Sequence, residues 1–593
     1  MMKNIKYLLI ASLVLFIGCE SVLDKDPLDK IADTAVWADE NLADAYLTDV
    51  YSNMIFRRLG SSNVGFGLIG GMSDEMTNFA PWQEPNRAIK TPMTSEQLYG
   101  PLNYWKYDLI RKINTFIEEV TASEFDETYK TARIAEARWM RAYTYFETAK
   151  RYGGIPLITA VQQIDDDPET IFVPRNTEQE VYDYIDAELT AIFNDLPESY
   201  TSELGRVTRW AALALQSRSN LFAASIARFG TVDLNGVVGI PAGLEDTYWN
   251  KSYDASKKLI ELGPHSLYRK NADPVLNYRQ LFIDEIEGNP EVIFSERYDG
   301  DSDMGHSNAS LTVHADFATA WNSNFRVYLD IVEKFEFADG TSGAIPRADY
   351  ASKEWTMDEL FHNRDPRFIA SILYNESTMG WKANNYDSNI AYFHEQSKVN
   401  GAWVKAGVLP NGVPAKASNR SFEPRPKPMR QGFLMRKFLD ESAGSQVSGG
   451  ESGEDFHIFR LGEIYLNLAE AAFYLNKPGE ALVAVNEIRD RAGMPDKLAI
   501  DEEVIRNERA VELIFEEHRF WDLRRWRIAE QVLNGKRMMG LKFEYNYDTD
   551  KYIIGVKNAD PVNRDFQPQH YYYPLTLGKI SDNPLLVENP MYE

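Results

Sequence analysis

One run of charged residues near the carboxyl end holds the residue types that could do chemistry. Glu512, Glu516, Glu517, His518 and Asp522 lie close together, and the last two, four apart, share a face if the run is helical. Carboxylates beside a histidine could serve acid/base catalysis or bind a metal. The run also holds arginines that can neutralise these acids: Arg506, Arg509, Arg519, Arg524, Arg525 and Arg527. We therefore interpret it as an ion-pair network that ties its helix to the body.

Other catalytic patterns are missing from the sequence. There is no His-Glu-x-x-His pattern, no phosphate-binding glycine loop and no Gly-x-Ser-x-Gly elbow, and the chain has only 8 His. We expect no catalytic residues, no metal and no cofactor. The run Asp165, Asp166 and Asp167 could hold a structural calcium ion, but a solvated loop is the preferred interpretation.

Cys19 is the only cysteine of the 593 residues, and it follows a short apolar run. Lys3 and Lys6 precede residues 7–18, which carry no charge and are too few to span a membrane, where about 20 are needed. Residues 15–19 resemble a bacterial lipobox, although Phe16 stands where Leu is usual. We predict a signal peptide at 1–18 and lipid attachment at Cys19; the alternative is an ordinary signal peptide with an incidental cysteine.

Lipidation would anchor the mature chain to a membrane, since two or more acyl chains bind stably. Residues 19–30 form a short acidic segment with Glu20, Asp24 and Asp26, which we predict to be a flexible tether. Acidic residues after the cysteine resemble the surface-export signal of Bacteroidetes lipoproteins. The expected location is the outer membrane, with the protein lipid-anchored and facing the exterior.

The net charge of the chain is −26, and without the signal it is −28, from 61 basic and 89 acidic residues. Such a charge opposes binding to nucleic acid and to anionic lipid surfaces, and it favours neutral partners. Aromatic residues make up 12% of the chain. Because no Pro- or Ser-rich linker divides the sequence, we expect residues 31–593 to form one large body.

Hydrophobic periodicity predicts a mainly α fold with two clusters of helices. The predicted helices cover 131–152, a segment starting at Thr177, 208–229, 461–475, a segment ending at 493–495, and 502–526. Thr177 and Glu180 form a capping-box pattern. Segments 232–243, 300–314, 401–430 and 443–455 show no sustained period. These patterns indicate a helical scaffold that presents a loop-rich face.

Several stretches resemble the SusD/RagB family, and they follow one another in that family's order. They cover residues 135–146, 151–157, 363–368, 459–471, 486–495, 508–513, 518–526 and 589–592. The resemblance implies a single mainly α body with tetratricopeptide-like helical pairs and a loop-rich ligand-binding face. It would have an N-terminal helical part at about 31–230 and a C-terminal RagB/SusD part at about 290–593.

The resemblance also implies a function. Such proteins are outer-membrane lipoproteins of Bacteroidetes that bind oligo- or polysaccharides, cap a SusC-like TonB-dependent transporter and have no catalytic activity. A peptide-binding, RagB-like uptake lipoprotein is the alternative. A surface glycosidase is the least favoured hypothesis, because it needs two carboxylates about 5–10 Å apart across the scissile bond.

A glycan site needs exposed aromatic rings for the C–H faces of sugars and polar side chains for the hydroxyls. Loop regions that offer this mix hold Asp74, Asn78, Trp82, Arg87, Tyr99, Asn103, Tyr298, Trp321 and Asn322, which we predict as ligand-binding residues. Trp139, Trp521 and Trp526 fall in helix motifs and are predicted to be core. The net acidity argues against uronate polymers unless a local basic pocket overrides it.

Overall fold

A computed structural model of the chain describes most of the predicted body. The described residues are 33–54, 69–78, 94, 96, 98, 102–299, 305–317, 323–383, 388–405, 432–441, 452–560 and 562–592. The predicted signal peptide, Cys19 and the tether lie outside them. No helix within these ranges has the length and apolar character needed to cross a membrane.

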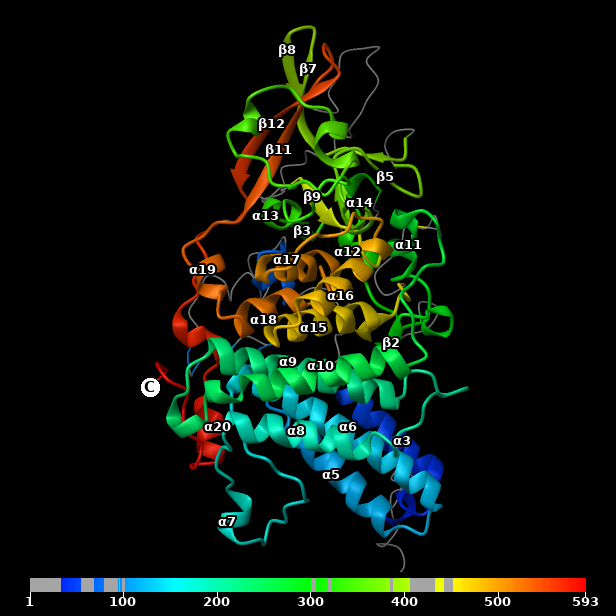
Figure 1. Cartoon of the computed structure of the whole chain (residues 1–593), viewed down its shortest axis with the longest axis vertical. Helices are drawn as coiled ribbons and strands as arrows, with labels where there is room; N and C mark the ends of the chain where they lie inside the picture. The colour runs from blue at the N-terminus through cyan, green and yellow to red at the C-terminus, as the bar shows by residue number, and fades with distance from the viewer. Residues whose placement is uncertain are drawn as a thin grey trace, which may run out of the picture.

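Long helices stack on one another in the lower half of the molecule (Figure 1). They are α3 (Glu40–Asn53), α5 (Tyr107–Ala122), α6 (Glu127–Tyr152), α8 (Glu178–Ile192), α9 (Arg209–Phe229) and α10 (Glu245–Leu262). The predicted helix 131–152 is confirmed as α6, which begins earlier because the Asp126 side chain accepts the N–H of Thr128. It ends at Gly153, whose φ of 80° suits glycine.

Local sequence signals place the next two helices correctly. The capping box before α8 is formed as predicted: the Thr177 hydroxyl accepts the N–H of Glu180, whose carboxylate accepts the N–H of Thr177. Helix α9 follows Thr208. It packs along α10, and buried serines allow this close approach, since Ser217 and Ser256 lie 2.8 Å apart through their hydroxyls.

The second helical cluster lies above the first (Figure 1). It contains α15 (Leu461–Tyr474), α16 (Pro478–Arg491), α17 (Glu502–Glu512) and α18 (His518–Arg525). The predicted hairpin of α15 and α16 is confirmed. The prediction of one helix over 502–526 is wrong, because Phe515 and Glu517 adopt left-handed φ values of 62° and 66°. Residues between α17 and α18 are buried, and their polar groups bond to other parts of the chain, which offsets the loss of helical hydrogen bonds.

Short strands join into small sheets beside these helices. One sheet has the order β1 (Met76–Asn78), β3 (Phe325–Val327), β9 (Phe433–Met435) and β4 (Ile372–Tyr374). A second has the order β12 (Lys551–Asn558), β11 (Met539–Asn546), β7 (His394–Val399) and β8 (Ala402–Lys405), and it forms the top of Figure 1. Two pairs complete the described strands: β10 (Phe456–Arg460) with β2 (Val292–Glu296), and β5 (Ser377–Thr378) with β6 (Ile390–Ala391).

Shorter helices connect these layers. They are α2 (Asp33–Val36), α7 (Pro168–Ile171), α11 (Pro274–Gln280), α12 (Asn308–Thr312), α13 (Leu329–Val332), α14 (Pro366–Ser371), α19 (Ala529–Leu533) and α20 (Leu577–Asp582). One hydrophobic core runs through both helical clusters and into the upper sheets, and includes Leu47, Trp139, Ile464 and Phe543. Trp139, Trp521 and Trp526 are at most 4% exposed, which confirms them as core residues.

Candidate functional site

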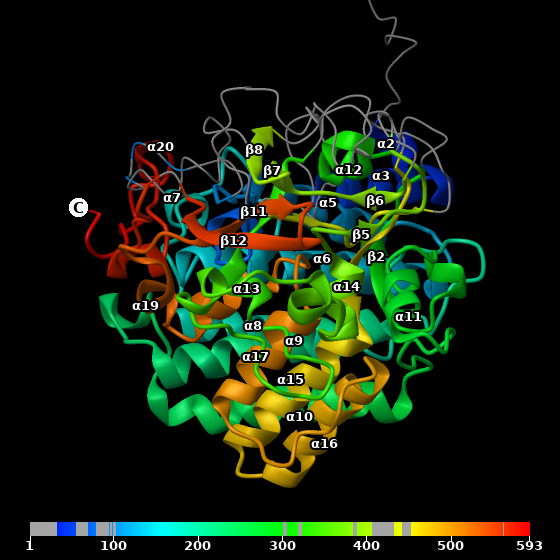
Figure 2. The same ribbon diagram turned by 90° about the horizontal axis from the view of Figure 1, so that it is seen from above.

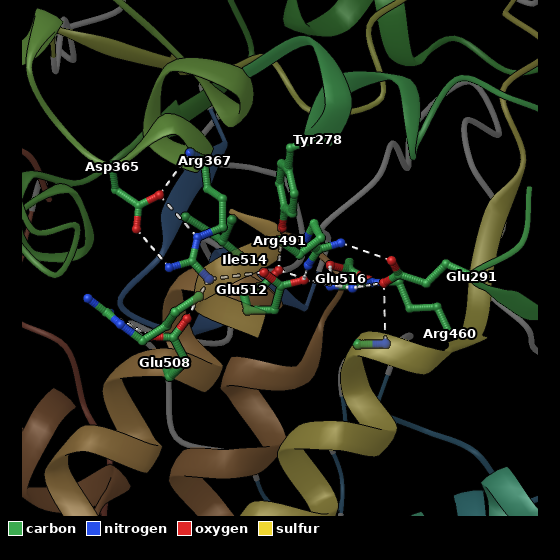
Figure 3. A network of polar contacts seen from close by, with 12 residues as sticks. Tyr278, Glu291, Asp365, Arg367, Arg460, Arg491, Glu508, Glu512, Ile514 and Glu516 are labelled. Carbon is green, nitrogen blue, oxygen red and sulfur yellow. Dashed lines mark hydrogen bonds and ion pairs between the residues drawn. The ribbon is translucent and has the colours of Figure 1, made fainter. Parts of the chain in front are cut away.

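A network of buried charges joins α14, α17 and the start of α15 (Figure 3). At its centre is Glu512, the last residue of α17. Its carboxylate accepts hydrogen bonds from Arg460 (2.8 Å), Arg367 (3.0 Å) and Arg491. All four side chains are at most 1% exposed. The charges therefore neutralise one another out of contact with water.

The network reaches several elements that are far apart in sequence. Arg460, at the end of β10, also binds Glu516 and lies 2.8 Å from Glu291, which directly precedes β2. Arg367, in α14, binds Asp365 and Glu508 as well. A helix, a strand pair and the turn between α17 and α18 are thus joined through charged groups.

The pKa values of the buried carboxyls indicate that the network stabilises the fold. Burial opposes ionisation of Glu512, but the surrounding arginines outweigh it and hold the pKa of this carboxyl far below its usual range. Glu516 behaves in the same way: burial opposes ionisation, but Arg460 and Lys437 hold its pKa down. Carboxylates fixed in the ionised form and fully enclosed cannot transfer protons to a ligand. Asp522 is likewise paired with Arg509 (3.1 Å) and Arg525 (2.7 Å), so the interpretation as an ion-pair network is confirmed for these acids. Arg524 and Arg527 instead donate to a carbonyl and a hydroxyl group, those of His570 and Tyr572.

The turn after Glu512 also fixes the start of the first predicted ligand segment. The Phe515 N–H donates to the Glu75 carboxylate (3.1 Å), and Arg519 donates two hydrogen bonds of 2.8 Å to Asp74. Arg564 donates to the Ser73 carbonyl. Strand β1 follows directly and pairs with β3 through Met76 and Val327. The chain therefore enters the segment after Asn78 from a fixed point in the core.

Asp74 is predicted as a ligand residue, but the structure places it in the interior. It is 4% exposed, and both carboxylate oxygens are bonded to Arg519. Burial alone would raise its pKa, yet Arg519 outweighs this and the net pKa lies below its ordinary value. The side chain therefore anchors β1 and is turned away from solvent.

Tyr298 follows β2 at the edge of the described structure and is partly exposed. Its N–H donates to Asp455 (3.1 Å), and its ring lies edge-on to His306 with centroids 4.9 Å apart. Burial raises the pKa of Asp455 to about 6. Because Glu291 and Arg460 secure both strands of the β2–β10 pair, the same network that anchors β1 also positions Tyr298.

Asn103 is exposed and belongs to a second group of side chains. Its side-chain oxygen accepts a hydrogen bond from Lys579 (2.7 Å), whose ammonium lies 5.9 Å from the ring centre of Trp105 and 5.5 Å from that of Tyr152. Burial lowers the pKa of Lys579 to about 8. An amide, a partly exposed indole and a cation are thus gathered near the carboxyl end, and neither Trp105 nor Lys579 is among the predicted ligand residues.

The remaining predicted residues cannot be placed in either group. The backbone of Asn78 pairs with Phe325 in β1. Trp82, Arg87, Tyr99, Trp321 and Asn322 lie outside the described residues. Asn103 and Tyr298 have different neighbours among the residues that are described, so these two do not form one contact cluster there. The only signal for Trp105 in the sequence is its position two residues after Asn103.

The aspartate run at 165–167 lies in an exposed turn, where Asp166 accepts the N–H of Gln163 (2.7 Å). Across the described ranges, no group of three or more His, Cys, Asp or Glu side chains is placed to hold a metal ion. A calcium ion at this turn would therefore draw its ligands mainly from backbone carbonyls and water.

Comparisons with known proteins point to one family. Residues 290–592, about half of the chain, match a family model described as the SusD family, and residues 28–221 match one described as starch-binding and associating with the outer membrane. A SusD-like protein of Bacteroides ovatus is 23% identical, with 100% of this chain and 98% of the relative covered.

Solved structures agree with this match. The crystal structure of a SusD-like protein from Bacteroides fragilis has a TM-score of 0.73 at 25% identity, covering 96% of this chain and all of the other. A SusD-like carbohydrate-binding protein from the same species has a TM-score of 0.69 at 23% identity, covering 93% of this chain and all of the other.

Proposed function

Because the chain belongs to the SusD family, we propose that it binds oligo- or polysaccharides at the cell surface and delivers them to a SusC-like, TonB-dependent transporter of the outer membrane. The family match carries this proposal. The predicted lipid on Cys19 would hold the protein beside the transporter, and the loop-rich face would receive the ligand.

The described geometry supports a binding role over a catalytic one. Tyr298 offers part of an aromatic ring at the end of a rigid strand pair, and Asn103 offers an exposed amide near the indole of Trp105. These are groups that can cover the C–H face of a sugar and bond to its hydroxyls. By contrast, the densest group of carboxylates is enclosed and paired with arginine, so it offers no acid and base to a glycosidic bond.

Titration calorimetry of the mature protein against a panel of polysaccharides tests the proposal. We expect at least one neutral or weakly charged glycan to bind with a Kd between about 1 μM and 1 mM, which corresponds to about −8 to −4 kcal/mol. A pool of peptides in the same assay tests the RagB-like alternative. Binding of peptides with no glycan bound would favour that alternative, and release of reducing sugar from a bound polymer would revive the glycosidase.

A further inference from the structure

The sheet β12–β11–β7–β8 has two unlike faces. The register of its strands shows which residues lie on each face. One face packs into the core through Phe543, Tyr545, Tyr552 and Ile554, all at most 2% exposed. Alternate residues point the other way, since successive side chains of a strand lie on opposite faces. Figure 2, which looks down on this end of the molecule, shows the four strands side by side.

The outer face carries a row of one residue from each strand. Lys551 pairs with Asn546, Asn546 with Lys398, and Lys398 with Trp403. The next row is made in the same way from Ile553, Glu544, Gln396 and Lys405. In the antiparallel pairs, directly opposite residues have Cβ atoms about 4.5–5.5 Å apart, so Lys398 lies beside Trp403 and Gln396 beside Lys405. Asn546 is only 2% exposed, so the exposed part of the first row is divided between Lys551 on one side and Lys398 and Trp403 on the other.

Trp403 is 44% exposed on β8, the outermost described strand of this sheet. Its neighbours on the face are both lysines: Lys398 lies opposite it, and Lys405 follows it by two positions on the same strand. Lysine on an edge strand also discourages pairing with another sheet. That role, however, does not call for a large exposed ring between the lysines.

The charges of this outer face are unevenly compensated. Lys542 lies 2.6 Å from Glu544, and that pair is neutral. Among the described residues, Lys398, Lys405 and Lys551 have no carboxylate within ion-pair distance. Glu354 is bonded to Thr549 (2.6 Å) and Asn546 (2.8 Å), and these bonds, with the positive charges of Lys398 and Lys551, lower its pKa. Glu354 therefore partly compensates those two lysines, and Lys405 is the least compensated. Asp548 lies at the β7–β8 turn and accepts the N–H groups of Asn400 and Gly401.

We propose that this outer face is a second glycan site, made of other residues than the predicted ligand residues, that takes an acidic polysaccharide bearing carboxylate or sulfate groups. The indole of Trp403 covers the C–H face of one sugar. Lys398 and Lys405 pair with the anionic groups of that sugar and the next, and Gln396 bonds to hydroxyls. Charge complementarity selects this ligand locally, against the overall net charge of −26, because Lys398 and Lys405 are the neighbours of the exposed indole on this face. The proposal rests on the proposed function only in that the ligand is a glycan.

Affinity electrophoresis of the mature protein with polygalacturonate, alginate and chondroitin sulfate tests this site. Fully methyl-esterified polygalacturonate and laminarin serve as uncharged probes. We expect at least one acidic polymer to bind, and Trp403→Ala and the double variant Lys398→Ala/Lys405→Ala each to weaken its binding about tenfold or more. Binding should also weaken between 50 and 300 mM NaCl, and the esterified polymer should not compete.

Two control variants separate the possible outcomes. Lys257→Ala/Lys270→Ala removes the same charge from exposed lysines away from this sheet and should leave binding unchanged. Leu498→Ala, at a 95% exposed apolar residue between α16 and α17, should also leave acidic-polymer binding unchanged. If acidic polymers bind but the Trp403 variant binds them normally, or if only neutral glycans bind, the sheet-face site is refuted while the proposed function stands. If no glycan of either kind binds, both fail.

Discussion

Arg519 holds Asp74 by two hydrogen bonds of 2.8 Å, although 445 positions separate the two residues in the sequence. The pair joins α18 to the residue two positions before β1, and it is at most 6% exposed on either side. Together with the bond from Phe515 to Glu75, it makes the start of β1 part of the core. The segment after β1, the first in which ligand residues are predicted, thus begins at a point set by the carboxyl-terminal helices.

Removing one partner of this pair should destabilise the protein strongly. Asp74→Asn would leave the Arg519 guanidinium buried without its counter-charge, at a cost of about 3–5 kcal/mol. We expect a clear fall in the thermal midpoint by differential scanning calorimetry. The double variant Asp74→Asn/Arg519→Met should lose less free energy of unfolding than the two single variants lose when their losses are added. A stable Asp74→Asn protein with weakened glycan binding would instead make Asp74 a ligand residue.

The central network should matter far more than surface ion pairs. Arg460→Met removes one buried positive charge that contacts Glu291, Glu512 and Glu516, and the remaining partners Arg367, Arg491 and Lys437 no longer balance these carboxylates. We therefore expect a loss of at least about 3 kcal/mol. Arg269→Met is the matched control, because the Arg269–Asp490 pair is 45% and 69% exposed and should contribute less than about 1 kcal/mol. Equal effects of the two changes on the unfolding midpoint would contradict the structural role of the network.

Glu75 should make stability depend on pH. Burial raises its pKa to about 7, so the neutral form stabilises the fold below about pH 4.5, and this contribution is lost as the pH rises through 7. Glu75→Gln keeps an acceptor for the Phe515 N–H and removes the cost of ionisation, which is at most about 3 kcal/mol. We expect the variant to exceed the wild type in thermal midpoint at pH 8 but not at pH 4.5. Glu261→Gln, on the surface of α10, controls for the lost charge.

Cys19 should determine where the protein is found. Cys19→Ala removes the thiol that would be acylated, so we expect the protein to lose incorporation of labelled fatty acid and to leave the membrane fraction. Uptake of the bound glycan should then fall, because the binding protein no longer stays beside its transporter. A released variant that supports full uptake would overturn the role of the tether.

Periodicity and capping signals are local, which is why α6, α8, α9, α15 and α16 could be predicted from the sequence. The break between α17 and α18 could not, because it depends on partners such as Lys437, which donates to the Ile514 carbonyl (3.0 Å) from far along the chain. The short strands escape prediction for a related reason: they are too short to show a clear alternation.

In the candidate site too, some features follow from the local sequence and others depend on contacts between distant residues. Residue type alone makes Asp74 resemble a ligand, and only the fold brings Arg519 to it. Asn103 and Tyr298 are placed where polar and aromatic groups reach the surface, but Trp105 and Lys579 join Asn103 through tertiary packing. Trp403 lies in a segment without sustained period, and its pairing with Lys398 follows from a strand register that the sequence does not reveal.

The most direct test of the proposed function measures glycan binding at the loop face. Once titration calorimetry has identified a bound glycan, the same titration is repeated with Trp82→Ala, Trp321→Ala and Tyr298→Ala. Leu498→Ala, at a 95% exposed apolar residue between α16 and α17, serves as the control. We predict that at least one aromatic variant loses about tenfold or more in affinity while Leu498→Ala binds normally. Undiminished binding by all three aromatic variants, or no glycan bound by the wild-type protein, would contradict the account.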